Sequence, residues 1–178
     1  MKIYTKTGDD GKTSLFDNTR IWKSHNRIMS YGAVDELNSS LGVALSLELD
    51  NEIKDILIRI QNDLFVVGSD LANPDMSNTK IRTTSEMIEF LEKKIDHIEP
   101  NLSELTNFVL PGGTLLASIL HLSRTIARRA ETHVVALLQS EEVSKNAFVY
   151  LNRLSDLLFV LARLVNKRKS VSDIIWKP

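Results

Sequence analysis

Apolar residues recur at helical spacing over most of this 178-residue chain, and this pattern constrains its fold more than any other feature. Spacings of three and four residues place side chains on one face of a helix. Five stretches follow the pattern, each bounded by polar capping residues, proline or glycine. We predict helices over residues 33–45, 53–71, 84–98, 114–139 and 144–168.

The connections between these stretches are short, and no stretch alternates convincingly as a strand would. The pattern therefore predicts an all-α fold, a five-helix antiparallel bundle. We expect residues 1–178 to form a single domain, because one core suffices at this length. Residues 1–27 are expected to form an irregular polar arm, residues 28–170 the bundle and residues 171–178 a C-terminal tail. Residues 74–83 are the only long loop expected in the body.

Composition excludes several classes of function. The chain has no cysteine, which excludes disulfides, thiolate metal sites and cysteine nucleophiles. A formal charge of −1 provides no overall field to attract nucleic acid or an anionic membrane, so an anion site must be local. No apolar run approaches the roughly 20 residues that span a bilayer, and the N-terminus lacks a signal-peptide core. We expect a cytoplasmic protein that binds neither nucleic acid nor membrane.

The polar arm contains a segment with the composition of a phosphate-binding loop. A Walker A loop, G-x-x-x-x-G-K-[ST], that ended at Gly11-Lys12-Thr13 would need a glycine at position 6, which is Lys6. Glycines, hydroxyls and lysines still suit a polyphosphate, and Asp9 and Asp10 could help to hold Mg²⁺. The residues concerned are Thr5, Lys6, Thr7, Gly8, Gly11, Lys12, Thr13 and Ser14. A glycine turn in a polar arm is the alternative.

Polar residues also follow faces of helices that should pack. In the fourth helix His121, Arg124, Arg128 and Glu131 share one side, and Arg129 points elsewhere. Two arginines one turn apart could clamp a triphosphate or a carboxylate. The alternative is a solvated face with a weak pair between Arg128 and Glu131.

Two further helices carry comparable stripes. The fifth helix places Asn152, Asp156, Phe159 and Arg163 on one face. The first helix carries a small polar stripe composed of Asp35, Ser39, Gly42 and Ser46. Three such stripes together predict a site between helices or an oligomer interface.

Other catalytic chemistry is missing from the sequence. The four histidines form no zinc-binding pattern, and no G-x-S-x-G motif is present. The residues favour anion positioning without an obvious acid, base or nucleophile, which fits a reaction whose nucleophile is brought by a cofactor.

Five segments, in order along the chain, resemble the PduO-type ATP:cob(I)alamin adenosyltransferases. They are Tyr4–Gly11, Ser30–Ser39, Phe108–Gly113, Ser123–Glu131 and Tyr150–Asp156. The resemblance implies a homotrimer of five-helix bundles with active sites between subunits. It also implies transfer of the 5′-deoxyadenosyl group of ATP to cob(I)alamin, with adenosylcobalamin and inorganic triphosphate as products.

The resemblance further implies roles for individual residues. The residues that would contact ATP are Thr5, Lys6, Thr7, Gly8, Thr13, Ser14, Lys23, Arg128, Arg129, Glu131 and Asn152. Asp35 and Arg124 would form a salt bridge between subunits that supports corrinoid binding. Phe108 would occupy the lower axial side of cobalt, favouring base-off, four-coordinate cob(II)alamin and easing its reduction. Mg²⁺ would bind through the ATP phosphates rather than through a direct side-chain ligand, and a flavin-type reductase would be a partner.

Some positions depart from the family pattern. Asp10 stands where many members have a basic residue, Ser24-His25-Asn26 replaces a more acidic stretch, and Thr132 stands where arginine is common. Two alternatives to the transferase hypothesis remain open from the sequence. One is an ATP-binding helical-bundle regulatory protein without adenosyl transfer, and the other is a structural bundle whose polar stripes form an oligomer interface.

Overall fold

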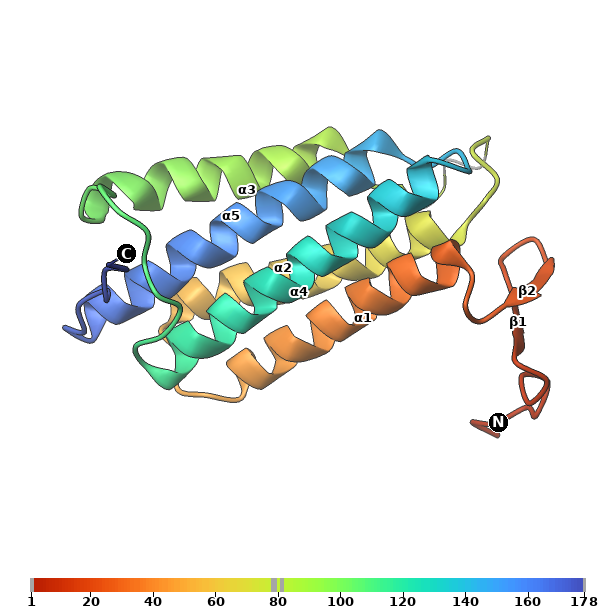
Figure 1. Ribbon diagram of the computed structural model, residues 1–178, viewed down its shortest axis with the longest axis horizontal. Helices are drawn as coiled ribbons and strands as arrows, with labels where there is room; N and C mark the ends of the chain where they lie inside the picture. The colour runs from red at the N-terminus through yellow and green to blue at the C-terminus, as the bar shows by residue number, and fades with distance from the viewer. Residues whose placement is uncertain (1, 78–79, 81, 178) are drawn as a thin grey trace.

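The computed structural model confirms the all-α five-helix bundle (Figure 1). The structure describes residues 2–77, 80 and 82–177. The helices are α1 Asn26–Leu45, α2 Asn51–Ala72, α3 Ser85–Ile98, α4 Leu115–Leu138 and α5 Lys145–Arg168. The chain reverses direction from each helix to the next, so α3 and α5, which pack together, run parallel (Figure 1).

Helix ends fall close to the predicted capping residues. Asp50 caps α2 by accepting from the Ile53 N–H at 3.0 Å, and Thr114 caps α4 by accepting from the Ala117 N–H at 3.2 Å. After α3, the chain forms one short 3₁₀ helix, η1 Glu99–Asn101, which contains the proline expected to stop it. In the predicted loop 74–83, residues 78, 79 and 81 lie outside the described residues.

Helix α1 begins at Asn26, earlier than the apolar pattern predicted. The reason is that polar residues occupy the buried positions of its first turns: Arg27 is 2% exposed and Ser30 is fully buried. Apolar periodicity cannot detect a helix turn whose buried face is polar.

A buried arginine fixes this end of the bundle. Arg27 donates to Glu141 Oε2 at 2.6 Å and to the Leu71 carbonyl at 2.7 Å. These contacts join the start of α1 to the end of α2 and to the α4–α5 connection. The base of the N-terminal arm is therefore attached to a rigid part of the bundle.

The core lies between α1, α2, α4 and α5, with α3 packed on α5. Its most completely buried side chains are mainly leucines, and burial of each stabilises the fold by roughly 1.5 to 3 kcal/mol. Examples are Leu37, Leu41, Leu57, Leu64, Leu120, Leu151, Leu154 and Leu158. None of the helices in the described part of the chain is both long and apolar enough to cross a membrane.

The arm is more regular than the sequence indicated. The sequence predicted an irregular arm, but β1 Lys12–Ser14 and β2 Arg20–Trp22 form an antiparallel hairpin in it, with Thr13 opposite Ile21. This hairpin could not be predicted from the sequence, since three-residue strands are too short to show the alternation of apolar and polar residues. Figure 1 shows that this arm stands away from the bundle, at the end where α1 begins.

The opposite end of the bundle is formed by the segment between η1 and α4 together with the C-terminal tail. Val109 and Ile175 form an isolated antiparallel bridge. The Trp176 N–H donates to the Phe108 carbonyl, and the Leu110 N–H donates to the Ile174 carbonyl, both at 2.8 Å. The tail thus holds the segment that carries Phe108.

Candidate functional site

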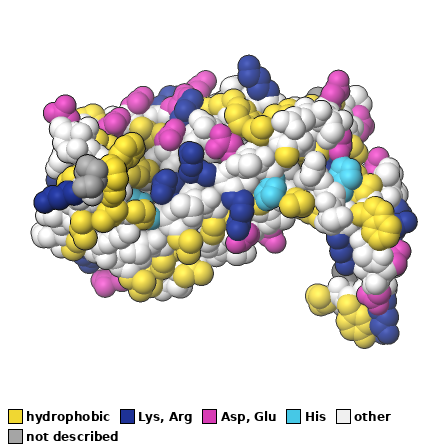
Figure 2. All heavy atoms as spheres, viewed as in Figure 1, with side chains coloured by type: hydrophobic (Ala, Val, Ile, Leu, Met, Phe, Trp, Pro, Cys, Tyr) yellow, Lys and Arg dark blue, Asp and Glu magenta, His cyan; other side chains and the backbone are white. Residues whose placement is uncertain are grey.

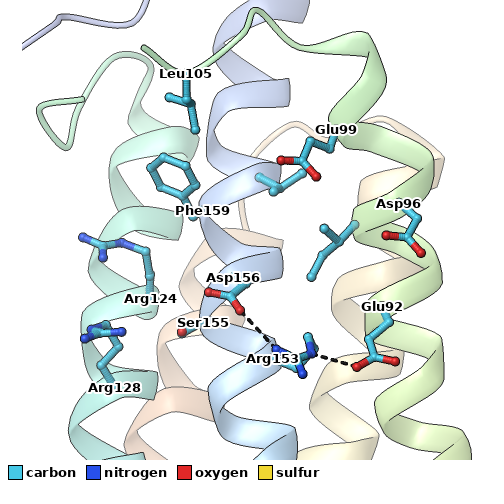
Figure 3. A pocket seen from close by; sticks show the side chains of 12 residues that line it. Glu92, Asp96, Glu99, Leu105, Arg124, Arg128, Arg153, Ser155, Asp156 and Phe159 are labelled. Atoms are coloured by element: carbon cyan, nitrogen blue, oxygen red, sulfur yellow. Dashed lines mark hydrogen bonds and ion pairs between the residues drawn. The ribbon is translucent and has the colours of Figure 1, made fainter. Parts of the chain in front are cut away.

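A depression of about 580 Å³ opens between α3, α4 and α5 (Figure 3). Arg124 and Arg128 lie on its α4 side, one turn apart, while Glu92, Asp96 and Glu99 lie on its α3 side. Arg153 lies between these walls, where it donates to Glu92 Oε1 at 2.9 Å and pairs with Asp156 at 3.6 Å. Arg153 therefore already neutralises part of the acidic α3 side. The positive charge that is left for a ligand lies on the α4 side.

Arg124 and Arg128 differ from the other arginines of the chain. Among the described residues, neither forms an ion pair with a carboxylate. Each of the others does: Arg20, Arg27, Arg59, Arg82, Arg129, Arg153, Arg163 and Arg168. Burial and the charge of Arg128 lower the pKa of Arg124. Two adjacent guanidinium groups without counter-charges form a site suited to an anion.

The ion pair that the solvated-face alternative required is absent from the described structure. Glu131 instead accepts from Asn152 Nδ2 at 2.9 Å, which joins α4 to α5 beside the arginines. Arg129 points away from this face and pairs with Glu36 of α1. Glu131 and Asn152 are thus brought together about one helical turn from Arg128, and Arg129 is not part of that group.

A second, more apolar pocket of about 760 Å³ adjoins the first and shares Leu105, Arg124 and Phe159 with it. Phe108 and Trp176 both line it and pack edge to face, with ring centroids 6.3 Å apart. The Phe108 ring is 78% exposed, so it is available to a ligand. In Figure 2, hydrophobic side chains gather at the end of the bundle near the C-terminal tail, beside the Lys and Arg side chains on the α4–α5 face.

The segment that presents Phe108 is held by a residue that sequence reasoning missed. Asn166, buried in α5, donates to the Gly112 carbonyl at 3.0 Å and accepts from the Thr114 N–H at 3.0 Å. Gly113 has φ +106°, and a Cβ there would lie 2.3 Å from the Asn166 side chain, so only glycine fits. The Pro-Gly-Gly turn was visible in the sequence, but its distant partner was not. Trp176 was missed as well.

The polar stripe on α5 was partly misinterpreted. Asp156 and Phe159 line the first depression as expected, but Arg163 is 5% exposed and binds Asp173 at 2.8 Å. It therefore belongs to the attachment of the C-terminal tail. His121, expected on the polar face of α4, is 2% exposed. Its ring packs edge-on against Phe159 with centroids 5.9 Å apart.

The arm assembles a second group of residues predicted to bind phosphate. The hydroxyls of Thr5 and Thr7 hydrogen-bond at 2.8 Å, and Lys23 Nζ donates to the Gly8 carbonyl at 2.8 Å. Thr13 and Ser14 lie on β1. Lys6 has φ 62°, in the left-handed region that favours glycine. The chain thus turns at this position without a glycine.

Asp10, the suggested Mg²⁺ contact, is already engaged. Its Oδ1 accepts from the Lys12 N–H at 3.1 Å and from Arg20 Nη2 at 3.1 Å. The Lys12 N–H is the main cause of a lowered pKa of Asp10. Within the described ranges, no group of three His, Cys, Asp or Glu residues could hold a metal ion.

Asp35 lies on a different face from Arg124. It lines an apolar groove of about 320 Å³ between α1 and α2, next to Phe16 and Phe65, which are 64% and 70% exposed. The described part of the chain contains no ion pair between Asp35 and Arg124. Two such exposed phenylalanines around a carboxylate form a surface suited to another chain.

One chain therefore brings its candidate residues together in separate groups. The arm carries the hydroxyls and lysines, and the α4–α5 face carries the free arginines and the Phe108 pocket. Figure 1 shows the arm projecting from one end of the bundle, away from the segment between η1 and α4 at the other.

The chain is similar to proteins of known activity along nearly its full length. The family described as cobalamin adenosyltransferase matches residues 3–165. A corrinoid adenosyltransferase of Bacillus subtilis is 46% identical over 182 residues, covering 99% of this chain and 93% of that protein. The PduO corrinoid adenosyltransferase of Salmonella typhimurium is 40% identical over 177 residues, covering 98% of this chain and 53% of that protein.

Solved structures of PduO-type ATP:corrinoid adenosyltransferase variants from Lactobacillus reuteri have the same fold. One, complexed with cobalamin and ATP, superposes with a TM-score of 0.95 and is 38% identical, covering 99% of this chain and 97% of that one. Another, complexed with ATP, superposes with a TM-score of 0.92 and is 38% identical, covering 98% of this chain and 100% of that one.

Proposed function

This chain belongs to the cobalamin adenosyltransferase family, and from that premise we propose that it transfers the 5′-deoxyadenosyl group of ATP to cob(I)alamin. The products are adenosylcobalamin and inorganic triphosphate. The observation that carries the proposal is the pair Arg124 and Arg128, which lack carboxylate partners in the described structure and border an aromatic pocket. A cationic wall beside an apolar pocket suits a polyphosphate and a large, flat, mostly apolar ring.

We propose that the arm and the α4–α5 face bind ATP from two sides. Residues 1–27 act as the nucleotide-binding arm, in which the hydroxyls and Lys6 and Lys23 surround the phosphates. From the bundle, Arg128 holds the triphosphate, and Glu131 and Asn152, already joined at 2.9 Å, contact the nucleotide. Arg129 is the weakest candidate, because it pairs with Glu36. Mg²⁺ would bind through the phosphates and supply further positive charge there, because the described residues form no preformed group of carboxylates for it.

The corrinoid occupies the pocket beside Phe108. The exposed Phe108 ring lies on the lower axial side of cobalt and excludes the nucleotide tail of cobalamin. Loss of that ligand favours four-coordinate cob(II)alamin, which is easier to reduce to cob(I)alamin. A flavin-type reductase in the cytoplasm would supply the electron, and the exposed face of the pocket leaves room for its approach.

The proposed chemistry needs no general base. Cob(I)alamin donates an electron pair to C5′ of ATP, so that a cobalt–carbon bond forms as the C5′–oxygen bond breaks. The triphosphate leaves with the pair from that bond, and Lys6, Lys23 and Arg128 stabilise its growing charge, to which a bound Mg²⁺ would add. The chain's task is to align two substrates, which alone can supply several kcal/mol of the lowering of the barrier.

Subunit association would join the two groups of residues that one chain keeps apart. We propose a homotrimer in which the arm of one subunit meets the α4–α5 face of the next. Asp35 would then reach Arg124 of a neighbouring subunit, and the groove around Phe16 and Phe65 would be covered. Closed rings of this kind use two different surfaces on each subunit.

The activity is tested by anaerobic incubation with ATP, Mg²⁺ and chemically reduced cobalamin. We expect the absorbance spectrum of cob(I)alamin to convert to that of adenosylcobalamin, with one triphosphate released per product. ATP without corrinoid should yield no triphosphate. Folded protein that binds ATP but forms no adenosylcobalamin would instead favour the regulatory nucleotide-binding alternative.

A further inference from the structure

Arg20, on β2 of the arm, binds two groups of the segment that is predicted to bind phosphate. Its Nη2 donates to the Thr7 carbonyl at 2.7 Å and to the two carboxylate oxygens of Asp10 at 3.1 and 3.3 Å. Thr7 lies 13 residues before Arg20, so the contact holds the segment against the hairpin. A hydrogen bond from a charged donor is stronger than one between neutral groups. Arg20 therefore fixes the direction of the Thr7 carbonyl.

The direction of this carbonyl determines where the Gly8 N–H points. The two groups belong to one planar trans peptide, in which the C=O and the N–H point in opposite directions. Since Arg20 holds the carbonyl on the hairpin side, the N–H faces the other side of the loop. In the described part of the chain, the Gly8 N–H donates to no backbone carbonyl. It is therefore free to donate to an anion.

The carbonyl of the next peptide is also held by a cation. The Gly8 carbonyl accepts from Lys23 Nζ at 2.8 Å and from the Gly11 N–H at 3.2 Å. A Cβ at position 8 would lie 3.0 Å from Lys23 Nζ, so glycine allows the lysine to approach. Lys23 keeps two further N–H donors for a ligand. Arg20 and Lys23 thus occupy two successive carbonyls, and the side of the loop left open presents N–H groups, as phosphate-binding loops do.

Asp10 anchors the guanidinium of Arg20. Its Oδ1 also accepts from the Lys12 N–H at 3.1 Å, so the carboxylate is itself fixed in the loop. A carboxylate close to a triphosphate would by repulsion alone weaken ATP binding. Repulsion therefore predicts that ATP binds more tightly when Asp10 is removed. Anchoring of Arg20 predicts the opposite.

We propose that Arg20 is a positioning residue of the ATP site, which directs the Gly8 N–H to the phosphates by holding the Thr7 carbonyl. It acts through this peptide and not by touching the nucleotide, and Asp10 supports it by orienting the guanidinium. The inference rests on the proposed function, because it requires the arm to bind ATP.

The test measures the Kd for ATP with Mg²⁺ by isothermal titration calorimetry on the whole chain. The proteins are the wild type, Arg20→Ala, Asp10→Ala and the double variant. We expect Arg20→Ala to raise the Kd roughly tenfold. Asp10→Ala should raise it as well, and the double variant should bind about as weakly as Arg20→Ala, because Asp10 acts through Arg20.

Arg168→Ala is the matched control. The side chains of Arg20 and Arg168 are both 38% exposed, and each pairs with an aspartate, Arg168 with Asp50 at 2.7 Å. Arg168 lies at the end of α5, away from the arm (Figure 1). We expect this variant to bind ATP as the wild type does.

Affinity for cobalamin and the thermal unfolding midpoint separate positioning from a general loss of structure. Both should stay unchanged in Arg20→Ala, because the arm stands away from the bundle (Figure 1). A fall in both, together with weaker ATP binding, would overturn the inference, because Arg20 would then act only on the fold.

The double variant distinguishes the roles that Arg20 could have. Recovery of wild-type ATP affinity would show that Arg20 only neutralises Asp10, and additive losses would show that Asp10 acts independently. Either result would overturn the inference and leave the proposed function standing, as would an unchanged Kd in Arg20→Ala or tighter binding in Asp10→Ala. A wild type that binds no ATP would overturn the proposed function and this inference with it.

Discussion

Replacing Arg128 with alanine is expected to lower kcat/KM for adenosyl transfer by roughly 30- to 5000-fold, which corresponds to about 2 to 5 kcal/mol. The reason is that Arg128 has no carboxylate partner in the described structure and lies beside Arg124, so its charge is available to the leaving triphosphate. The measurement is the initial rate of adenosylcobalamin formation with prereduced cobalamin and varied ATP.

Two control variants separate charge from geometry. Arg128→Lys keeps the charge but loses the planar, bidentate donor pair, so it should recover only part of the rate. Lys93→Ala removes an exposed cation that pairs with Glu89 at 3.2 Å, and it should leave the rate unchanged. Near-normal turnover in Arg128→Ala would remove this residue from the site.

Phe108→Ala is expected to lower the rate from cob(II)alamin with a reductant by roughly 100-fold, because the ring contributes about 2 to 3 kcal/mol of apolar contact. The loss should be much smaller with prereduced cob(I)alamin, since the ring acts on the reduction rather than on the transfer. Phe108→Leu keeps an apolar side chain in the pocket and should retain more of the rate than alanine does. Equal losses from both oxidation states would contradict the axial role of Phe108.

The fold could be predicted largely from apolar spacing, and the exceptions have physical causes. Helices α2 and α4 begin at caps that the sequence displays, Asp50 and Thr114, because each of these caps acts within three residues. The first turns of α1 were missed because Arg27 and Ser30 are buried by tertiary contacts. The hairpin in the arm was missed because its strands are only three residues long.

For the candidate site, the sequence could identify residue types but not their partners. Helical spacing correctly placed Arg124 and Arg128 on one face, but it could not indicate that they alone among the arginines lack carboxylates in the described structure. Helical spacing placed Arg163 on the same face of α5 as Asp156 and Phe159. Its charge is nevertheless neutralised by an ion pair with Asp173 in the C-terminal tail. Asn166 holds the Phe108 segment across 52 residues or more of sequence, a distance that no local pattern records.

The central claim is that the arm of one subunit and the α4–α5 face of another complete each site. The most direct measurement mixes two inactive variants, Lys6→Ala and Arg128→Ala, by co-refolding them in equal amounts. In a ring of shared sites, about a quarter of the sites would then combine an intact arm with an intact Arg128, so activity should return toward a quarter of the wild-type value. Mixed oligomers that form but remain as inactive as either parent would contradict the claim.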